Sequence, residues 1–297
     1  WAARNAALGG ADVTLFDKKR EIGVPSHPAN SIYEGMMGIT GEKIKKCYVR
    51  RKIKGMKIIS PSGHEVKIDT PGYSIDKTKF DQYYAKRARK VGVKIESGKT
   101  VSNITKRGDK YFFKETDENG IAETVRCDLL ILADGVFSNN SRKLGLKTMK
   151  YRNDIAWGTE LEIKAKGIGK TRYGEYYVGS HAPGWKSSFL PLGGDNAAVG
   201  VYVRRHGKNL KPFLDNWIKR VEEIKGISYD MEIVSRKFAG DPIVTIPNKI
   251  VAEGLMVCGG AAGQSGIGYG MRAGQIAGNV AAKAIAVNDT SLRALSE

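Results

Sequence analysis

An acidic residue ends the first predicted strand of the chain, at a point where it could bind a ribose. Val13, Leu15 and Phe16 predict a short buried strand before Asp17, after an alanine-rich segment over 1–8 with helical propensity. In a dinucleotide-binding fold, a carboxylate at this point follows a glycine-rich turn by about 20 residues. Counting back places that turn upstream of Trp1, so we expect an internal fragment. Taken alone, Asp17 equally fits a solvated turn.

A second stretch, Ala133-Asp134-Gly135, follows the apolar run 129–132 and precedes Ser138 and Arg142. Glycine lets phosphate and ribose approach the backbone closely, and a helix that begins near residue 139 would direct its positive end at anions. An isolated Asp-Gly pair is usually only a turn. The apolar strand before this pair favours a cofactor site.

A third stretch, Gly259–Gly263, follows the apolar run 254–258. Glycines then recur every four residues, at 266, 270, 274 and 278. This spacing is typical of paired membrane helices, but polar residues such as Arg272 interrupt the segment. We favour the alternative, in which small residues let a helix pack closely on a sheet.

The elements around these stretches predict an α/β protein. Continuous apolar runs such as 129–132 suit a parallel sheet that is covered on both faces. Alternating hydrophobicity predicts four antiparallel strands, at 155–164, 172–178, 186–191 and 196–203. A helix over 210–224 and strands over 230–238 and 254–258 follow. This order indicates one nucleotide-binding domain interrupted by a second domain.

The remaining pattern predicts a hairpin over 56–68, a helix over 76–91, and strands at 93–95, 101–104, 111–113 and 123–126. We assign the segments 1–54, 76–150 and 248–297 to the nucleotide-binding domain. The hairpin region 55–75 and the antiparallel region 151–247 are assigned to the substrate side.

Composition narrows the class of protein. The chain carries 49 Lys and Arg against 31 Asp and Glu, a net charge of +18 at pH 7. With 41% hydrophobic and 27% charged residues, it is too charged for an integral membrane protein and too apolar for a disordered one. Its three cysteines, at 47, 127 and 258, lie far apart and favour neither disulfides nor a zinc or other metal site. Without a signal peptide pattern, a cytoplasmic location is expected.

Together the three stretches resemble the FAD-dependent reductase and hydroxylase superfamily. Within it the chain is most similar to the geranylgeranyl reductase family, especially archaeal digeranylgeranylglycerophospholipid reductases, and the resemblance covers nearly the whole chain. It also rests on Gly23-Val24-Pro25 and on the helix start Asp76–Asp81. It implies an FAD-binding Rossmann-like domain of the glutathione-reductase/hydroxylase type, interrupted by an antiparallel-sheet substrate domain.

The resemblance implies a set of FAD-binding positions. Asp17 matches the acid on the adenosine ribose, Val101 a backbone contact to the adenine, and Gly266-Ile267 a pair whose amides face the flavin ring. The full set is Asp17, Pro28, Ala29, Lys77, Val101, Ala133, Asp134, Gly135, Gly260, Ala261, Gly263, Gly266 and Ile267.

The chain departs from the family pattern at several of these positions. Pro28 replaces a cysteine near the flavin, and Lys77 stands where an arginine is usual. Gly260 replaces the aspartate of a G-D-A-A-G stretch, and a lost charged hydrogen bond costs about 1.5–3 kcal/mol, or roughly tenfold to a hundredfold in affinity. The N-P-x-T-G stretch that usually follows is missing, so Gly263 leads through two residues to Gly266.

Residues 183–191 resemble the family's aromatic P-x-x-Y-x-W-x-F-P stretch, shortened and shifted in its aromatics. The resemblance places Gly184, Trp185, Phe189 and Pro191 beside an apolar cavity for a polyprenyl chain. The alternative is that Trp185 and Phe189 are ordinary core residues.

The implied function is the FAD-dependent reduction of isoprenoid C=C bonds in geranylgeranyl-type membrane lipids, with ferredoxin or NAD(P)H as electron donor. One alternative is a flavin-dependent monooxygenase or hydroxylase of the same fold. A second alternative is a non-catalytic protein that binds lipids or polyanions, which the departures above favour. No His, Cys or carboxylate stands out as a proton donor, so the catalytic residue stays unassigned.

A basic run lies in the first part of the chain. It comprises eight residues without an intervening acid between Lys43 and Lys57: Lys43, Lys45, Lys46, Arg50, Arg51, Lys52, Lys54 and Lys57. Such runs are usually solvated faces, but this one could hold the protein peripherally on an anionic membrane, at the inner face. No nucleic acid partner is expected, because no recognised nucleic-acid-binding motif accompanies the charge.

Overall fold

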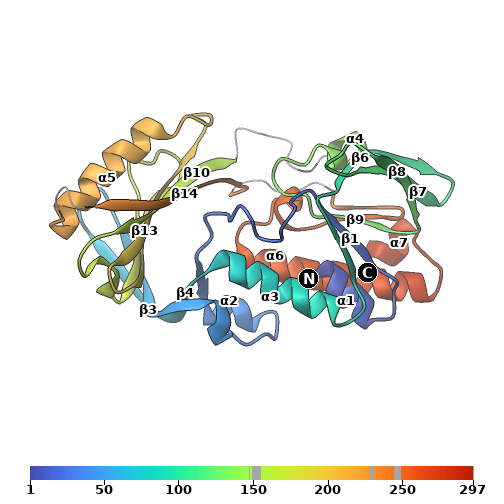
Figure 1. The fold of residues 1–297 in the computed structure, drawn as a ribbon, viewed down its shortest axis with the longest axis horizontal. Coiled ribbons are helices and arrows are strands. Elements are labelled where there is room, and N and C mark those ends of the chain that lie inside the picture. Colours follow the sequence, from blue (N-terminus) through green and yellow to red (C-terminus); the bar gives the residue numbers. More distant parts are fainter. Residues whose placement is uncertain (147, 149–154, 228–230, 244–248, 297) are drawn as a thin grey trace. The chain divides into compact units, whose positions relative to one another are not determined.

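The computed structural model describes all residues except 147, 149–154, 228–230, 244–248 and 297. The chain forms two compact units, each built from segments that are distant in sequence. Unit 1 comprises Trp1–Pro25, Thr78–Arg152 and Pro242–Glu297, and unit 2 comprises Ser26–Lys77 and Asn153–Asp241. Figure 1 labels the elements of both units.

Unit 1 contains helices that pack around short strands. Its helices are α1 (Ala2–Leu8), α3 (Lys77–Arg89, which starts at the last residue of unit 2), α4 (Asn140–Lys143), α6 (Ile267–Ala286) and α7 (Leu292–Ser296). Its strands are β1 (Thr14–Asp17), β5 (Lys94–Ser97), β6 (Thr100–Arg107), β7 (Lys110–Thr116), β8 (Ala122–Cys127), β9 (Leu130–Leu132), β15 (Val251–Ala252) and β16 (Leu255–Val257). β1 pairs in parallel with β5, and β9 pairs in parallel with β16.

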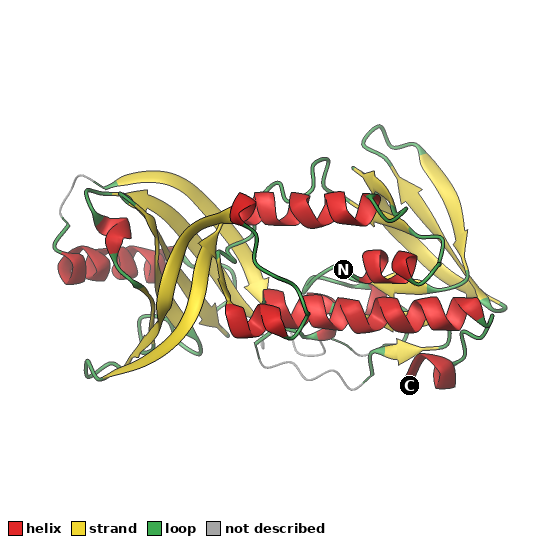
Figure 2. Ribbon diagram, turned by 90° about the horizontal axis from the view of Figure 1, so that it is seen from below, coloured by secondary structure: helices red, strands yellow, loops and turns green. Residues whose placement is uncertain are grey.

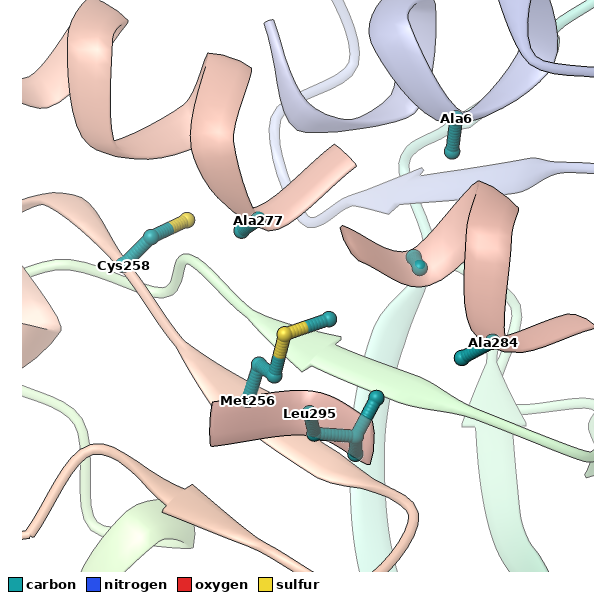
Figure 3. Packing of buried hydrophobic residues seen from close by; sticks show 7 residues of the cluster. Ala6, Met256, Cys258, Ala277, Ala284 and Leu295 are labelled. Carbon is teal, nitrogen blue, oxygen red and sulfur yellow. The ribbon is translucent and has the colours of Figure 1, made fainter. Parts of the chain in front are cut away.

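The glycine-rich helix α6 packs against α1. A Cβ atom at Gly278 would overlap the Ala2 carbonyl oxygen and lie 2.9 Å from the Ala6 amide nitrogen, and one at Gly274 would lie 3.0 Å from Trp1 Cβ. The glycine spacing predicts close packing on a sheet, whereas these two glycines face a helix. Figure 3 shows Ala6 of α1 and Ala277 of α6 in the core that also contains Met256 of β16. Among the described residues, no helix is long and apolar enough to cross a bilayer.

Unit 2 is one eight-stranded sheet with helix α5 (Lys211–Lys225) and the short helix α2 (Glu34–Gly38). Its strand order is β14-β10-β13-β12-β11-β3-β4-β2. The strands are β2 (Ser31–Tyr33), β3 (Val49–Ile59), β4 (Glu65–Ile75), β10 (Ala156–Lys164), β11 (Tyr173–Tyr177), β12 (Lys186–Gly193), β13 (Asn196–Arg204) and β14 (Glu232–Asp241). All pairs are antiparallel except β11 with β3. Figure 2 shows that the sheet is strongly curled.

The two faces of this sheet differ in what they contact. Helix α5 packs on one face, where the fully buried Trp217 donates a hydrogen bond from Nε1 to the Ser188 carbonyl oxygen over 3.1 Å. The inner face of the curl carries an apolar cluster that includes Ile53, Leu190 and Tyr33. Asn30, just before the edge strand β2, hydrogen-bonds to Glu160 of β10 and Lys237 of β14, near the opposite edge.

The predicted fold class is confirmed, and the four predicted antiparallel strands are β10 to β13. The compact units divide the chain differently from the predicted segments, because residues 26–54 belong to unit 2. The reason is strand pairing: β2 and the first half of β3 both pair with β4, so the predicted hairpin spans 49–75. The predicted segment ends at 150 and 247 and the predicted strand start at Asp230 lie outside the described residues.

The contact between α1 and α6 predicts that Gly278→Ala destabilises the protein. The added methyl group would overlap backbone atoms of α1, which cannot move away as a flexible side chain can. We expect a loss of about 1–3 kcal/mol in the free energy of unfolding, measured by urea denaturation. Gly270→Ala is the matched control on the same helix, because its nearest neighbour, Gly259 Cα, lies 3.9 Å away. Equal stabilities of the two variants would contradict the proposed packing constraint.

Candidate functional site

The second and third glycine-containing stretches lie side by side in unit 1. The Cys258 amide donates a hydrogen bond to the Leu132 carbonyl oxygen over 2.9 Å, where the parallel strands β9 and β16 end. A Cβ atom at Gly260 would lie 3.3 Å from both the amide nitrogen and Cγ1 of Val136. The carboxyl ends of β9 and β16 therefore bring Ala133–Gly135 against Gly259–Gly263.

The backbone at this edge is open. Gly135, Gly259 and Gly266 have positive φ angles of 76°, 66° and 84°. A Cβ atom added to any of them would meet no atom within 4 Å. Ala133 and Asp134 are also exposed. Glycines with free space above the backbone suit the close approach of a phosphate, sugar or flat ring, so this edge fits a nucleotide cofactor.

Polar contacts hold the loops at this edge. Asn140 Nδ2 donates to Asp134 Oδ2 over 3.0 Å, and the Gly259 amide donates to Gln264 Oε1 over 2.5 Å. Gln264 lies in the shortened loop and was not among the predicted residues. Within the described part of the chain, the buried Ser138 Oγ has no hydrogen-bond partner. Ala261, also predicted, is fully buried in the core, backbone included.

Asp17 lies at the carboxyl end of β1, in a different sheet from β9 and β16. Its Oδ1 accepts a hydrogen bond from the Lys19 amide over 2.9 Å. Close by in sequence, Arg20 lines two open hollows of about 300 and 390 Å³ and forms an ion pair with Glu118 over 2.6 Å. Val101 pairs with Glu115 in the β6–β7 hairpin. Neither Asp17 nor Val101 lines these two hollows.

Three predicted cofactor residues belong to unit 2. Pro28 is buried, and its carbonyl oxygen accepts a hydrogen bond from the Tyr202 hydroxyl over 3.1 Å. Ala29 and Lys77 are half-buried, and Lys77 is the first residue of α3. Gly263 and the half-buried Ile267 lie in unit 1, on either side of Gly266.

The predicted substrate residues lie in different surroundings. Phe189 is fully buried, and Lys225 Nζ of α5 lies 4.2 Å from its ring centroid. Phe189 is thus part of the core under α5, as the alternative interpretation held. Trp185 is 38% exposed, and Lys186 Nζ lies 5.3 Å from its ring centroid. Pro191 is buried in β12, and Gly184 takes a positive φ of 78° in the turn before that strand.

A buried carboxylate in unit 2 was missed in the sequence. Glu160 of β10 is 5% exposed and contacts Asn30 and Tyr202. Burial raises the pKa of Glu160 to about 7, although Lys237, Asn30 and Tyr202 act in the opposite direction. The available signal was an acidic residue in the middle of a predicted strand. Among the described residues, no group of three or more His, Cys, Asp or Glu side chains is placed to hold a metal ion.

The architecture is that of flavin-dependent oxidoreductases. The structure of halogenase PltM in complex with FAD superposes with a TM-score of 0.75, with 11% identity over 99% of this chain and 70% of that chain. This similarity shows the fold only.

A geranylgeranyl bacteriochlorophyll reductase-like protein from Thermoplasma acidophilum is more similar. Its TM-score is 0.90, with 25% identity over 99% of this chain and 78% of that chain. Digeranylgeranylglycerophospholipid reductase 1 of Methanothermobacter thermautotrophicus is 33% identical over 100% of this chain and 77% of the relative. No protein-family model matches the sequence. The chain belongs to the digeranylgeranylglycerophospholipid reductase family, which confirms the resemblance seen in the sequence.

Proposed function

We propose that this protein is an FAD-dependent reductase of isoprenoid C=C bonds in geranylgeranyl-type membrane lipids. The observation that carries the proposal is the 33% identity to a reductase of this kind over the whole chain. The open glycine edge at the ends of β9 and β16 supports the cofactor assignment. An electron donor such as ferredoxin or NAD(P)H is part of the proposal.

The residues present fit FAD at several points. In the proposed arrangement Asp17 binds the adenosine ribose, and the backbone at Ala133–Gly135 and Gly260–Gly263 approaches the phosphates and the sugar-alcohol chain. The amides at Gly266 and Ile267, at the start of α6, face the flavin ring. When bound and reduced, FAD supplies a hydride for the double bond.

The aromatic residues of unit 2 are proposed to contact the isoprenoid. Tyr176, Trp185 and Tyr202 surround the Lys186 ammonium, with ring centroids 4.4, 5.3 and 5.5 Å from Nζ. Rings of this kind provide apolar contact area for a polyprenyl chain and help to exclude water. The protein's contribution is then to orient the alkene and keep it dry.

The proposed reaction predicts a defined product. FAD-reconstituted protein supplied with dithionite should convert a geranylgeranyl glycerophospholipid to species heavier by a pair of hydrogen atoms per reduced bond. Mass spectrometry of the extracted lipid measures this change. Incorporation of oxygen into an aromatic substrate would instead identify a hydroxylase. A colourless protein that does not take up FAD would contradict both enzymatic functions.

The position of Gly260 predicts how FAD retention can be improved. Gly260→Asp restores a hydrogen-bond acceptor, but its Cβ atom must fit 3.3 Å from Val136. Gly260→Ala introduces the same Cβ atom without the acceptor and is the matched control. We expect the Asp variant to retain FAD about tenfold more tightly than the Ala variant, measured by flavin release on dilution. Equal retention would contradict the proposed placement of the sugar-alcohol chain at Gly260.

The basic run predicts salt-sensitive binding to anionic membranes. Several of its residues already have partners. Arg50 forms a two-point ion pair with Glu162 at 2.6 and 2.8 Å, and Arg51 donates to the Lys170 carbonyl oxygen over 2.6 Å. Lys54 and Lys57 form ion pairs with Asp69 and Glu65 over 3.2 and 2.9 Å. Lys43, Lys46 and Lys52 are exposed. Replacing these three lysines with Gln should reduce partitioning to anionic vesicles at low salt by up to a hundredfold, because each charge contributes about 1 kcal/mol.

Vesicle sedimentation at rising salt measures this effect. A control variant with Gln at three exposed lysines outside the run, Lys90, Lys219 and Lys283, has the same net charge. Equal loss of binding in both variants would show that net charge, and not this run, attracts the protein to the membrane.

A further inference from the structure

Five large apolar side chains are exposed near one end of the unit 2 sheet, and we call them the apolar strip. They are Ile58 of β3, Val66 and Ile68 of β4, Val178 just after β11, and Trp185 just before β12. Val66 is 60% exposed, and the other four are between 38% and 40% exposed. Large apolar side chains that gather on one surface mark an interaction site, whereas scattered ones need no explanation.

Strand register places the aliphatic members of the strip on one face of the sheet. Ile58 is opposite Val66 in the antiparallel pair of β3 and β4, and beside Tyr176 in the parallel pair of β3 and β11. Residues paired across neighbouring strands point to the same face, and so do residues two positions apart in one strand. Ile68 therefore shares the face of Val66. Val178 shares the face of Tyr176, because its amide extends the hydrogen bonding between β11 and β3 over 3.0 Å.

The aromatic member of the strip joins the others through Lys186. The Lys186 ammonium lies 4.4 Å from the ring centroid of Tyr176 and 5.3 Å from that of Trp185. The turns that follow β3 and β11 also adjoin, since a Cβ atom at Gly179 would lie 3.3 Å from Pro61 Cγ. The strip is therefore one continuous surface beside two neighbouring turns.

The opposite face of the same strands is charged and is covered by α5. Glu175, one residue before Tyr176 in β11, accepts hydrogen bonds from Lys225 of α5 over 2.7 Å. Lys57, one residue before Ile58, pairs with Glu65 over 2.9 Å. Neighbouring residues in a strand point to opposite faces, so the apolar strip lies on the face away from α5.

The charge beside the strip fits an anionic lipid surface. Among the side chains that the structure describes, no carboxylate pairs with Lys186, so its ammonium can bind a lipid phosphate. Tryptophan rings and lysine ammonium groups occupy the headgroup region of a bilayer, while aliphatic side chains beside them enter the acyl boundary. The net charge of +18 attracts the protein to anionic lipids and opposes the docking of a second copy on this surface.

We propose that the apolar strip inserts into the surface of an anionic phospholipid bilayer, with Trp185 and Lys186 at the level of the headgroups. This inference goes beyond the proposed reductase function and does not depend on it. It also differs from the proposed role of the basic run, which attracts the membrane through charge alone. Apolar side chains that enter the bilayer add a contribution that salt does not screen.

A triple variant with Ile58→Thr, Val66→Thr and Ile68→Thr tests the strip. Threonine is β-branched, so the strands keep a residue type that suits them while the surface loses apolar area. The variant has the charge of the unmodified protein. We expect its binding to vesicles of phosphatidylcholine and phosphatidylglycerol at high salt, measured by sedimentation, to fall about tenfold.

The matched control carries the same three exchanges at exposed apolar residues away from the strip. Ile233→Thr and Val234→Thr lie on β14, at the other edge of the sheet, and Ile121→Thr lies just before β8 in unit 1. This variant should bind vesicles at high salt as the unmodified protein does. Equal binding by the strip variant and the control would overturn the proposal.

A second measurement uses the intrinsic fluorescence of the unmodified protein. Trp185 is the most exposed of the four tryptophans, and Trp157 and Trp217 are buried. Vesicles of the same phospholipids with brominated acyl chains should quench part of the emission at high salt, and Trp185→Phe should remove the part that is quenched.

Two results of this measurement would overturn the proposal. One is the absence of quenching, and the other is quenching that Trp185→Phe leaves unchanged. Self-association of the unmodified protein without lipid, abolished in the triple variant and measured by sedimentation velocity, would also overturn it, since the strip would then bind a second copy. All of these outcomes leave the reductase function standing, because none of them depends on turnover.

Discussion

Close backbone approach, possible only where a side chain is absent, determines how the segments of this chain meet. At Gly278, helix α6 lies against the Ala2 carbonyl oxygen of α1, and at Gly260 the third stretch lies against Val136. In unit 2, the ring of Tyr202 covers Gly158. A Cβ atom at Gly278 or Gly158 would overlap its partner, and one at Gly260 would fit only tightly, 3.3 Å from Val136.

Burying a carboxyl group inside the curled sheet costs free energy, which hydrogen bonds to that group offset. A carboxylate without partners inside an apolar curl would be strongly disfavoured. Glu160 avoids this cost because Asn30 and Tyr202 occupy its two oxygens, and because burial favours its neutral form. A second buried acid, Glu175, is instead stabilised by an ion pair. Lys225 Nζ lies 2.7 Å from both of its carboxyl oxygens. The two faces of one sheet thus carry one buried acid with a raised pKa and one ion pair.

The elements with strong local patterns were predictable, and the contacts between distant segments were not. Alternating hydrophobicity located β10 to β13 within a few residues, and continuous apolar runs located β9 and β16. The pattern could not show that residues 31–33 join the edge of a sheet whose other strands lie far along the chain. The same limit applies to Phe189. The family resemblance suggested a cavity beside it, whereas the helix that covers it begins more than 20 residues later, at Lys211.

In the candidate site too, local sequence patterns were predictive and contacts between distant segments were not. Asp134 and Gly260 were found because short motifs place them after strands, and the parallel pairing of β9 with β16 brings their stretches together. Glu160 was missed because one of its hydrogen-bond partners, Asn30, is 130 positions away in the sequence. Segment 28–30 supplies both an acceptor, the Pro28 carbonyl, and a donor, the Asn30 amide. The surroundings of Glu160 on β10 thus include a loop that precedes it by more than a hundred residues, a contact that no local pattern in the sequence could show.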